Sequence, residues 1–224
     1  MCGDSVASAM ARMSRQDLLK EYRIRRRKIQ SRLRDFTQLG KTASEAHLFA
    51  ELAFCLLTPQ TSARRCDSAV KELVRTRLLF RGGVEPIARV LHRQVRFHNH
   101  KARYIVETRA LLTRNRKLRV RERLVGEPAE IREWLLAEVP GFGLKEATHF
   151  MRNVGRSGDL AILDRHILRN MVRYGAMARM PASLSRRTYA IVERKFQTFA
   201  AELDLPPAAL DLLLWSQGTG EIFK

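Results

Sequence analysis

The residues most able to do chemistry lie between positions 138 and 166, where the sequence reads EVPGFGLKEATHFMRNVGRSGDLAILDRH. A glycine-rich turn is followed directly by Lys145, at the expected start of a helix, and the isolated carboxylate of Asp164 comes soon afterwards. A helix N-terminus and a desolvated cleft both disfavour an ammonium ion, so Lys145 could act as a neutral amine nucleophile. Such an amine can attack the C1′ atom of a sugar, release the base and leave a Schiff base that permits β-elimination. On spacing alone, a lysine that only binds phosphate is an equally good interpretation.

Asp164 follows the apolar run 160–163 and precedes a helical pattern that begins at Arg165. The default role of a carboxylate in that place is to cap the helix by accepting its first N–H groups. A carboxylate fixed there could also stabilise positive charge that develops on a sugar and take part in proton transfer. Capping and catalysis are therefore compatible roles for Asp164.

The turn before Lys145 predicts a helix-hairpin-helix motif. Pro140 ends one helix, Gly141 and Gly143 allow a tight turn and a close approach, and the next helix begins near Leu144. Exposed N–H groups at a helix N-terminus, with the positive end of the helix dipole, can hold a phosphate without regard to sequence. The alternative is a simple connection between two packed helices.

The composition favours a polyanionic partner. The 224 residues carry a formal net charge of +19, and each phosphate contact by Lys or Arg releases a condensed counterion. Basic clusters lie at 23–28 and 114–123, although a charge run is more often a solvated face than a specific contact. Because the chain lacks an apolar run of about 18 residues, a lipidation motif and a secretory signal, we expect DNA binding in the cytoplasm and no membrane association.

The cysteines and histidines argue against a metal centre. Cys2, Cys55 and Cys66 form no C-x-x-C pair, so neither a disulfide framework nor a four-cysteine zinc or iron–sulfur site is expected. His98 and His100 lack further ligands at metal-site spacing. We therefore predict that the protein needs no divalent metal and no redox cofactor.

Apolar residues recur at spacings of three and four through most of the chain, and strand alternation is absent. The pattern predicts an all-α protein with helices near 14–38, 43–57, 62–78, 84–91, 99–113, 129–138, 144–154, 165–174, 185–202 and 207–218. Residues 1–13 are expected to form a flexible tail, and 14–224 two helical subdomains that flank a DNA-binding cleft. We expect a helical bundle at about 43–138, a second subdomain from the first helix and about 150–224, and the hairpin 139–144 between them.

The segment 138–168 resembles the signature of the helix-hairpin-helix DNA glycosylase superfamily, with Lys145 and Asp164 at the positions of its catalytic lysine and aspartate. The fuller resemblance covers most of 14–224 and is to the type 2 8-oxoguanine branch of small archaeal and bacterial enzymes. It is carried by ELAFCLLT at 51–58, KARYIVE at 101–107, and DLLLW at 211–215 with Lys224. The resemblance implies a monomeric, bifunctional DNA glycosylase/AP lyase that excises 8-oxoguanine from duplex DNA in base excision repair.

The same resemblance implies further site residues. Trp215 is expected to stack on the flipped base and Lys224 to help recognise it, although Trp215 could equally be a core residue. Gln60 could fill the gap left by the extruded nucleotide, or merely be exposed beside a helix cap. Phe97, next to the DNA-binding candidate Arg96, could contact DNA or the base, or pack in the core.

His149 lies four residues after Lys145 and therefore on the same helix face. It could contact a phosphate or orient the site, although a structural histidine is the more usual interpretation. Hairpin carbonyls in this superfamily can hold a monovalent cation, the one cofactor that the resemblance implies. Two alternative functions stay open: a glycosylase for a different damaged base, and a non-catalytic DNA-binding module.

Overall fold

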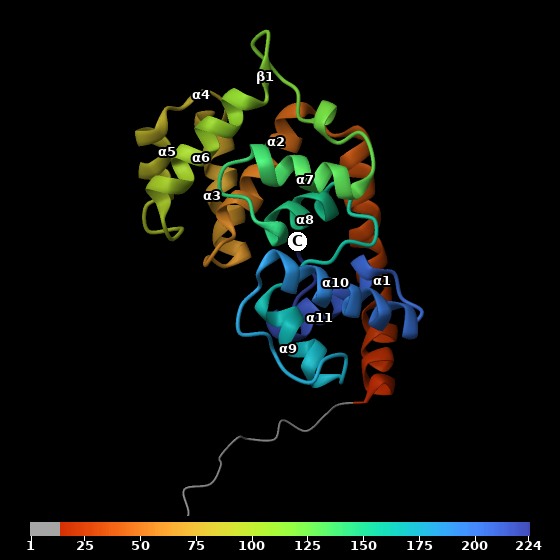
Figure 1. Cartoon of the computed structure of the whole chain (residues 1–224). Coiled ribbons are helices and arrows are strands. Elements are labelled where there is room, and N and C mark those ends of the chain that lie inside the picture. Colours follow the sequence, from red (N-terminus) through yellow and green to blue (C-terminus); the bar gives the residue numbers. More distant parts are fainter. Residues whose placement is uncertain (1–13) are drawn as a thin grey trace, which may run out of the picture.

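The computed structural model describes residues 14–224, and the tail expected at 1–13 lies outside them. The described chain is built from helices and one very short strand pair (Figure 1), which confirms the predicted all-α class. The helices are α1 (Arg15–Thr42), α2 (Glu45–Leu57), α3 (Ala63–Arg75), α4 (Leu78–Arg81), α5 (Val84–Leu91), α6 (His98–Leu111), η1 (Arg121–Arg123), α7 (Pro128–Glu138), α8 (Leu144–Asn153), α9 (Arg165–Arg173), α10 (Arg186–Glu202) and α11 (Pro207–Thr219). None of these helices is long and apolar enough to span a membrane.

The long helix α1 starts and ends for local reasons. Ser14 and Asp17 form a capping box that satisfies the first N–H groups of the helix. The helix continues to Thr42, beyond the predicted end at 38, although Gly40 has a low helix propensity. A Cβ at Gly40 would overlap the carbonyl oxygen of Val154, so this glycine serves the close approach of α1 to the end of α8.

Two sequence expectations about local structure were wrong. The helix predicted over 62–78 is broken after α3, because Arg77 adopts a left-handed conformation with φ 59° and α4 begins at the next residue. The strands β1 (Thr113–Arg114) and β2 (Lys117–Leu118) form an antiparallel hairpin where no strand was expected. Strands of two residues are too short to produce a recognisable alternation of polar and apolar side chains.

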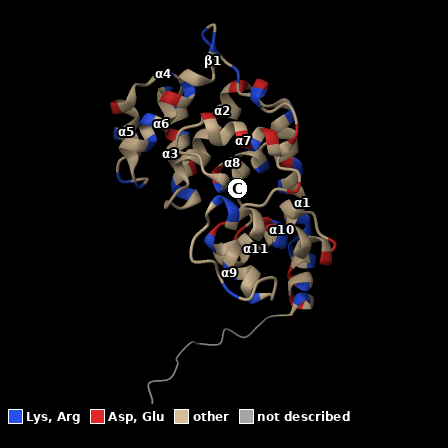
Figure 2. Cartoon of the chain, in the orientation of Figure 1, with Lys and Arg blue, Asp and Glu red and all other residues tan. Residues whose placement is uncertain are grey.

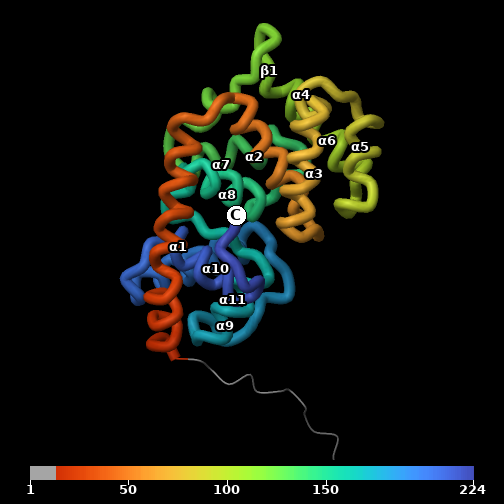
Figure 3. Tube along the Cα trace, turned by 180° about the vertical axis from the view of Figure 1, so that it is seen from behind, coloured from red at the N-terminus to blue at the C-terminus, as the bar shows by residue number. Residues whose placement is uncertain are grey.

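The buried side chains form two hydrophobic clusters. The first gathers residues from α2 to α8, including Phe49, Phe54 and Phe150, and the second gathers residues from α1, α9, α10 and α11, including Phe196. Helix α1 runs along one side of the molecule past both clusters (Figures 1 and 3). Trp215 packs against both clusters, which places it at their junction.

A buried ion pair also joins the two clusters. Arg132 on α7 donates to both carboxylate oxygens of Glu193 on α10, at 2.7 and 3.0 Å. Glu193 accepts a further bond of 2.9 Å from the N–H of Ala161. Because both charges are buried and bonded in a fork geometry, the pair fixes α7 against α10 rather than acting as a loose surface contact.

Candidate active site

The turn between α7 and α8 has the predicted helix-hairpin-helix form. Gly141 has a φ of 84°, and a Cβ there would overlap the ring of Tyr104. Both features require glycine. Gly143 caps α8 with a φ of −106°, which any residue can adopt, and a Cβ there would meet only the end of the Glu146 side chain at 3.1 Å. The tight turn therefore rests on Gly141 more than on Gly143.

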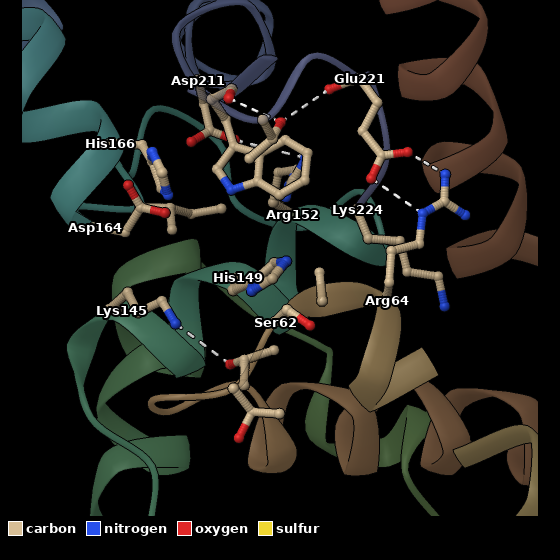
Figure 4. Close-up of a pocket in the computed structure, with 16 residues that line it drawn as sticks. Ser62, Arg64, Lys145, His149, Arg152, Asp164, His166, Asp211, Glu221 and Lys224 are labelled. Atoms are coloured by element: carbon tan, nitrogen blue, oxygen red, sulfur yellow. Dashed lines mark hydrogen bonds and ion pairs between the residues drawn. The ribbon is translucent and has the colours of Figure 1, made fainter. Parts of the chain in front are cut away.

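A cavity of about 320 Å³ opens between the two clusters, a volume within the range of small-molecule sites. Lys145 and Asp164 both line it, as do Trp215, Lys224 and His149 (Figure 4). We call Thr58, Lys145 and Asp164 the lysine wall of this pocket. The residues contributed by the C-terminal part of the chain, Trp215, Glu221 and Lys224, form the terminal wall.

Lys145 lies in the first turn of α8 and reaches toward the pocket. Its Nζ donates to Thr58 Oγ1 at 3.3 Å and to Glu146 Oε1 at 3.1 Å. The carboxylate of Glu146 therefore forms an ion pair with the side chain of Lys145 at the pocket. The sequence expectation considered only the two influences that favour the neutral amine, and it missed Glu146 although this residue is the next in the chain.

Asp164 is the N-cap of α9, as predicted. Its Oδ1 accepts a bond of 2.8 Å from the N–H of Ile167. This bond satisfies one of the free N–H groups at the helix start and holds the carboxylate at the pocket. The side chain is half-buried, so the carboxylate is fixed by the helix while it remains open to the cavity.

A buried ion pair that sequence reasoning missed lies behind the two walls. Arg152 on α8 has its Nη1 atom 3.5 Å from Oδ2 of Asp211 on α11, and both side chains line the pocket. Burial raises the pKa of the Asp211 carboxyl to about 7, although Arg152 acts to lower it. Burial also lowers the pKa of Arg152. Asp211 belongs to the motif DLLLW at 211–215, but nothing in the sequence indicated that its side chain is buried or that Arg152 is its partner.

His149 lies inside the pocket wall, one turn of α8 beyond Lys145. It is 7% exposed and packs edge-on against Phe54 with 5.6 Å between the ring centroids. Burial holds the pKa of His149 well below its usual value, and the cations Arg152 and Lys145 act in the same direction. A backbone hydrogen bond with Lys224 acts in the opposite direction and ties the imidazole to the end of the chain. The burial of the imidazole favours the structural interpretation, although the ring also lines the pocket.

Lys224 brings the end of the chain into the pocket. Its Nζ lies 3.1 Å from Glu51 Oε2 and 3.1 Å from Asp67 Oδ1, and 4.6 Å from the centre of the Phe54 ring. Burial alone would lower the pKa of Lys224, but the two carboxylates outweigh it and raise the pKa. The ammonium ion is therefore held firmly in place as part of the terminal wall.

Two further contacts fold the last residues back onto α3. Arg64 forms a fork-shaped ion pair with Glu221, and its guanidinium lies 4.2 Å from the centre of the Phe223 ring. Trp215 is half-buried and faces the same cavity. The structure thus brings Trp215 and Lys224, the two residues predicted to recognise a base, into one wall.

The other DNA-binding candidates lie outside this pocket. Gln60 and Arg96 line a second groove beside it, and the N–H of Arg96 donates to Thr61 Oγ1 at 3.2 Å. Phe97 is 51% exposed, has a φ of 57° and stacks under the Arg96 guanidinium at 5.4 Å. Its exposure excludes the core interpretation, and it is not among the residues that line the cavity of Lys145 and Asp164. Its predicted role in base recognition is therefore not supported, whereas contact with DNA at the surface is compatible with its position.

A buried lysine orders the loop that separates the pocket from this groove. Lys101 Nζ donates to the carbonyl oxygens of Leu57 and Pro59 at 2.7 Å each, and to Thr61 Oγ1 at 3.2 Å. Burial lowers the pKa of Lys101 to about 8. Sequence reasoning placed Lys101 in a family motif but did not foresee that it fixes the loop 58–62.

The fold and the pocket define the class of the protein: it is a helix-hairpin-helix protein with a lysine and a capped aspartate at one cavity. A family model described as 8-oxoguanine DNA glycosylase matches residues 29–205, and the chain belongs to this family. It is 34% identical over 210 residues to an 8-oxoguanine DNA glycosylase/AP lyase of Fusobacterium nucleatum, covering 93% of this chain and 96% of the relative. It is 39% identical over 209 residues to one of Metallosphaera sedula, covering 92% and 98%.

Solved structures give the same result. The crystal structure of the 8-oxoguanine DNA glycosylase of Thermotoga maritima matches with a TM-score of 0.83 and 33% identity, over 94% of this chain and 98% of that one. The Methanocaldococcus jannaschii 8-oxoguanine glycosylase/lyase, solved in complex with 15mer DNA containing 8-oxoguanine, matches with a TM-score of 0.82 and 29% identity. That match covers 93% of this chain and 100% of the other.

Proposed function

We propose that this protein is a bifunctional DNA glycosylase/AP lyase that removes 8-oxoguanine from duplex DNA in base excision repair. The observation that carries the proposal is that Lys145, behind the hairpin, and Asp164, at the N-cap of α9, line one cavity. A chain that only bound DNA would have no need of a nucleophile and a fixed carboxylate in a pocket. We infer that the excised base is 8-oxoguanine from the relatives named 8-oxoguanine DNA glycosylase/AP lyase.

DNA is held by its backbone while one nucleotide is extruded. The N–H groups at the start of α8 and the basic surface bind phosphates, and extrusion costs a few kcal/mol in lost stacking and pairing. The base enters the cavity, where Trp215 offers a stacking surface and Lys224 a fixed cation. The polar groups of the pocket distinguish 8-oxoguanine from guanine, because an unmatched donor or acceptor in a buried site is penalised.

Lys145 carries out the first chemical step. It must first lose a proton, for which Glu146, at 3.1 Å from Nζ, is the nearest acceptor. The free amine then attacks C1′ of the extruded nucleotide, the bond from C1′ to the base breaks, and the base leaves with the bonding electrons and takes up a proton. The Asp164 carboxylate stabilises the positive charge that develops on the sugar in this step.

Strand cleavage follows from the same covalent link. A proton passes from the nitrogen to O4′ as the C1′–O4′ bond opens, which converts the adduct into a protonated Schiff base with a free hydroxyl at C4′. Removal of a proton from C2′ then allows the 3′ phosphate to leave by β-elimination, and water finally releases the sugar from Lys145. The lysine therefore serves both the glycosylase and the lyase reaction.

We expect no redox cofactor or divalent metal in this chemistry, and a monovalent cation at the hairpin. The carbonyl groups of Pro140, Gly141 and Phe142 accept no backbone hydrogen bond from the described residues, so their oxygens are free to bind such an ion. We also propose that the protein acts as a monomer on chromosomal DNA in the cytoplasm, since one chain supplies both pocket walls.

Borohydride trapping tests the proposal. The protein is incubated with a duplex that contains one 8-oxoguanine, borohydride is added, and a covalent protein–DNA band is sought on a denaturing gel. We expect the wild type to give the band and Lys145→Gln to give none, because only a lysine Schiff base is reduced to a stable amine. A panel of duplexes with other damaged bases, run in parallel, distinguishes 8-oxoguanine from another substrate.

An abasic duplex separates the remaining outcomes. Trapping on the abasic duplex without trapping on the lesion would keep the lysine chemistry and reject the proposed base. Failure on both, with DNA binding intact, would reject catalysis and favour a DNA-binding module. Binding with a steep salt dependence is expected in every case and decides nothing by itself.

A further inference from the structure

The strand hairpin 113–118 is a basic projection away from the pocket. It extends from the end of the molecule beside α4, whereas Lys224 lies near the centre (Figures 1 and 3). Residues 113–119 read TRNRKLR, with four cations and no acidic residue, and Figure 2 shows the resulting basic tip. From the sequence, this basic cluster was expected to be a solvated face, and the proposed catalytic mechanism gives it no role.

The cations of the hairpin are free for a partner. Arg114, Arg116 and Lys117 are exposed, and their side chains make no hydrogen bond or ion pair with any other described residue. Arg119 has only a long contact of 3.7 Å with Glu122. Arg121, just beyond the hairpin, is different because it donates to the carbonyl groups of Gly40 and Ala43 and so holds the fold. The three tip cations have no comparable structural role.

The turn of the hairpin contains an arginine at a position where glycine would have less backbone strain. Asn115 and Arg116 have φ values of 50° and 60°, the left-handed pair found in the tight turns of two-residue hairpins. Asparagine tolerates this conformation and glycine adopts it without strain, but arginine does not. A strained arginine in an exposed hairpin turn indicates that its charge has a use.

The base of the hairpin is rigid. The N–H of Arg119 donates to the carbonyl of Leu112 at 2.8 Å, and the N–H of the buried Val120 donates to Glu45 Oε2 at 2.5 Å. Glu45 is in the first turn of α2, so the hairpin is fixed to the first hydrophobic cluster. The tip therefore presents its cations in a defined position.

We propose that this hairpin is a second DNA contact, at which Arg114, Arg116 and Lys117 bind phosphates of the duplex outside the stretch that covers the pocket. The proposal rests on the proposed function, because it assumes that duplex DNA is the substrate. The tip residues 114–117 include no aromatic side chain that could stack on a base, so the contact depends on phosphates and not on sequence. It would hold undamaged DNA during the search for a lesion and contribute little to excision itself.

A charge-matched pair of variants tests the contact. Arg114→Ala/Arg116→Gly/Lys117→Ala removes the tip cations, and Arg187→Ala/Arg194→Ala/Lys195→Ala removes three exposed, unpaired cations of α10. Affinity for undamaged duplexes of about 12 and about 40 base pairs is measured over a range of salt concentrations. Only on the long duplex should the hairpin variant lower the slope of log affinity against log salt, by about 0.9 for each phosphate that the tip no longer binds and up to about 2.7.

Excision of 8-oxoguanine from the short duplex should be unchanged in the hairpin variant. The second contact is overturned if this variant binds the long duplex with the wild-type slope, or loses no more than the α10 variant. A loss of binding to the long and the short duplex alike also rejects it. Failure of the proposed function would be seen separately, as wild-type protein that does not excise the base at all.

The single variant Arg116→Gly tests the contact in a second way, because it removes one cation and also changes the backbone strain of the turn. Relief of the left-handed strain should raise the melting temperature by about 2–4 °C, while affinity for the long duplex falls. Asn115→Gly, which removes no charge, should leave that affinity unchanged. An Arg116→Gly protein that binds the long duplex as well as the wild type would argue against a phosphate contact at the tip.

Discussion

The lysine wall and the terminal wall of the pocket are held by contacts of different range. Asp164 is bonded to Ile167 and Lys145 to its neighbour Glu146, so each is fixed mainly by its own helix start. Lys224 instead bonds to Glu51, which is 173 residues away in the sequence. Arg64 and Glu221 are separated by 157 residues. In the lysine wall, Lys145 and Asp164 are each oriented by their own helix start, although Lys145 also donates to Thr58, 87 residues away. The terminal wall exists only when the chain end packs onto α2 and α3.

This difference suggests a division of labour. The groups that would do the chemistry lie on helix starts, where the backbone fixes a side chain with little help from the rest of the protein. The groups that would recognise the base lie on a chain end, where ion pairs set their position. Chemistry and base recognition should therefore be separable by mutation, and four predictions test how far this separation goes.

Lys145→Gln should have the largest effect. Loss of the nucleophile should reduce single-turnover excision by about 10⁴-fold or more, because the other amine of the pocket, that of Lys224, is held between Glu51 and Asp67. Affinity for the lesion duplex should change little, since glutamine is only one atom shorter than lysine and only one cation is lost. Excision that survives the substitution with less than about a tenfold loss would assign the chemistry to a different group.

Asp164→Asn comes next, and it separates capping from charge. Asparagine caps a helix about as well as aspartate, so α9 and the melting temperature should be retained. The lost negative charge should slow both base excision and abasic-site cleavage by about 10²- to 10³-fold. Asp164→Ala is the companion variant, since it loses the cap as well and should also be less stable by about 1 kcal/mol. Full activity in Asp164→Asn would mean that the aspartate only caps the helix and takes no part in the chemistry.

The lysine wall could be predicted from sequence because its signals are local. The turn at 140–143, the helix start at Leu144 and the N-cap at Asp164 are each specified by a few neighbouring residues. The fold class followed in the same way from the spacing of apolar residues. Lys145 and Asp164 were therefore placed correctly at helix starts before any tertiary contact was known.

The remaining features depend on residues far apart in the sequence. The positions of Trp215 and Lys224 came from resemblance, and the partners of Lys224, Glu51 and Asp67, could not be foreseen. The continuation of α1 through Gly40 depends on its approach to Val154, a tertiary contact. Local patterns fail at such places because the deciding contact is made only in the folded chain.

The pair formed by Arg152 and Asp211 connects the two walls, and it predicts a pH effect on stability. The pKa of Asp211 is about 7 in the folded protein and near 3.8 when the chain is unfolded. The folded state therefore holds an extra proton between these values, and the stabilisation is complete below pH 3.8 and lost as the pH rises through 7. The free energy of unfolding should fall by on the order of 2–3 kcal/mol from pH 5 to pH 8 for this reason.

Asp211→Asn provides the control for this effect. The amide cannot ionise, so the variant should resemble the wild type at pH 5 and show a flatter dependence of unfolding free energy on pH. Urea unfolding at several pH values measures the difference between the two proteins. Parallel profiles for the wild type and the variant would mean that Asp211 does not titrate in this range.

Glu51→Gln should have the smallest effect on rate and gives the sharpest test of the two-wall comparison. Glu51 is 3% exposed and bonds both to Lys224, at 3.1 Å, and to Asn153 Nδ2, at 2.6 Å. Glutamine can keep the bond to Asn153 but loses the charge that fixes the Lys224 ammonium ion. Excision of 8-oxoguanine should slow by about tenfold, the equivalent of one weakened charge-assisted hydrogen bond.

The same Glu51→Gln protein should cleave an abasic duplex at the wild-type rate, because that substrate has no base for the terminal wall to recognise. Asp164→Asn should be slow on both substrates, so the two variants together distinguish a defect in recognition from a defect in chemistry. Melting curves of both variants show whether the fold is retained. If Glu51→Gln slows cleavage of the abasic duplex as much as excision of the base, the two walls act as one unit and the proposed division between them is wrong.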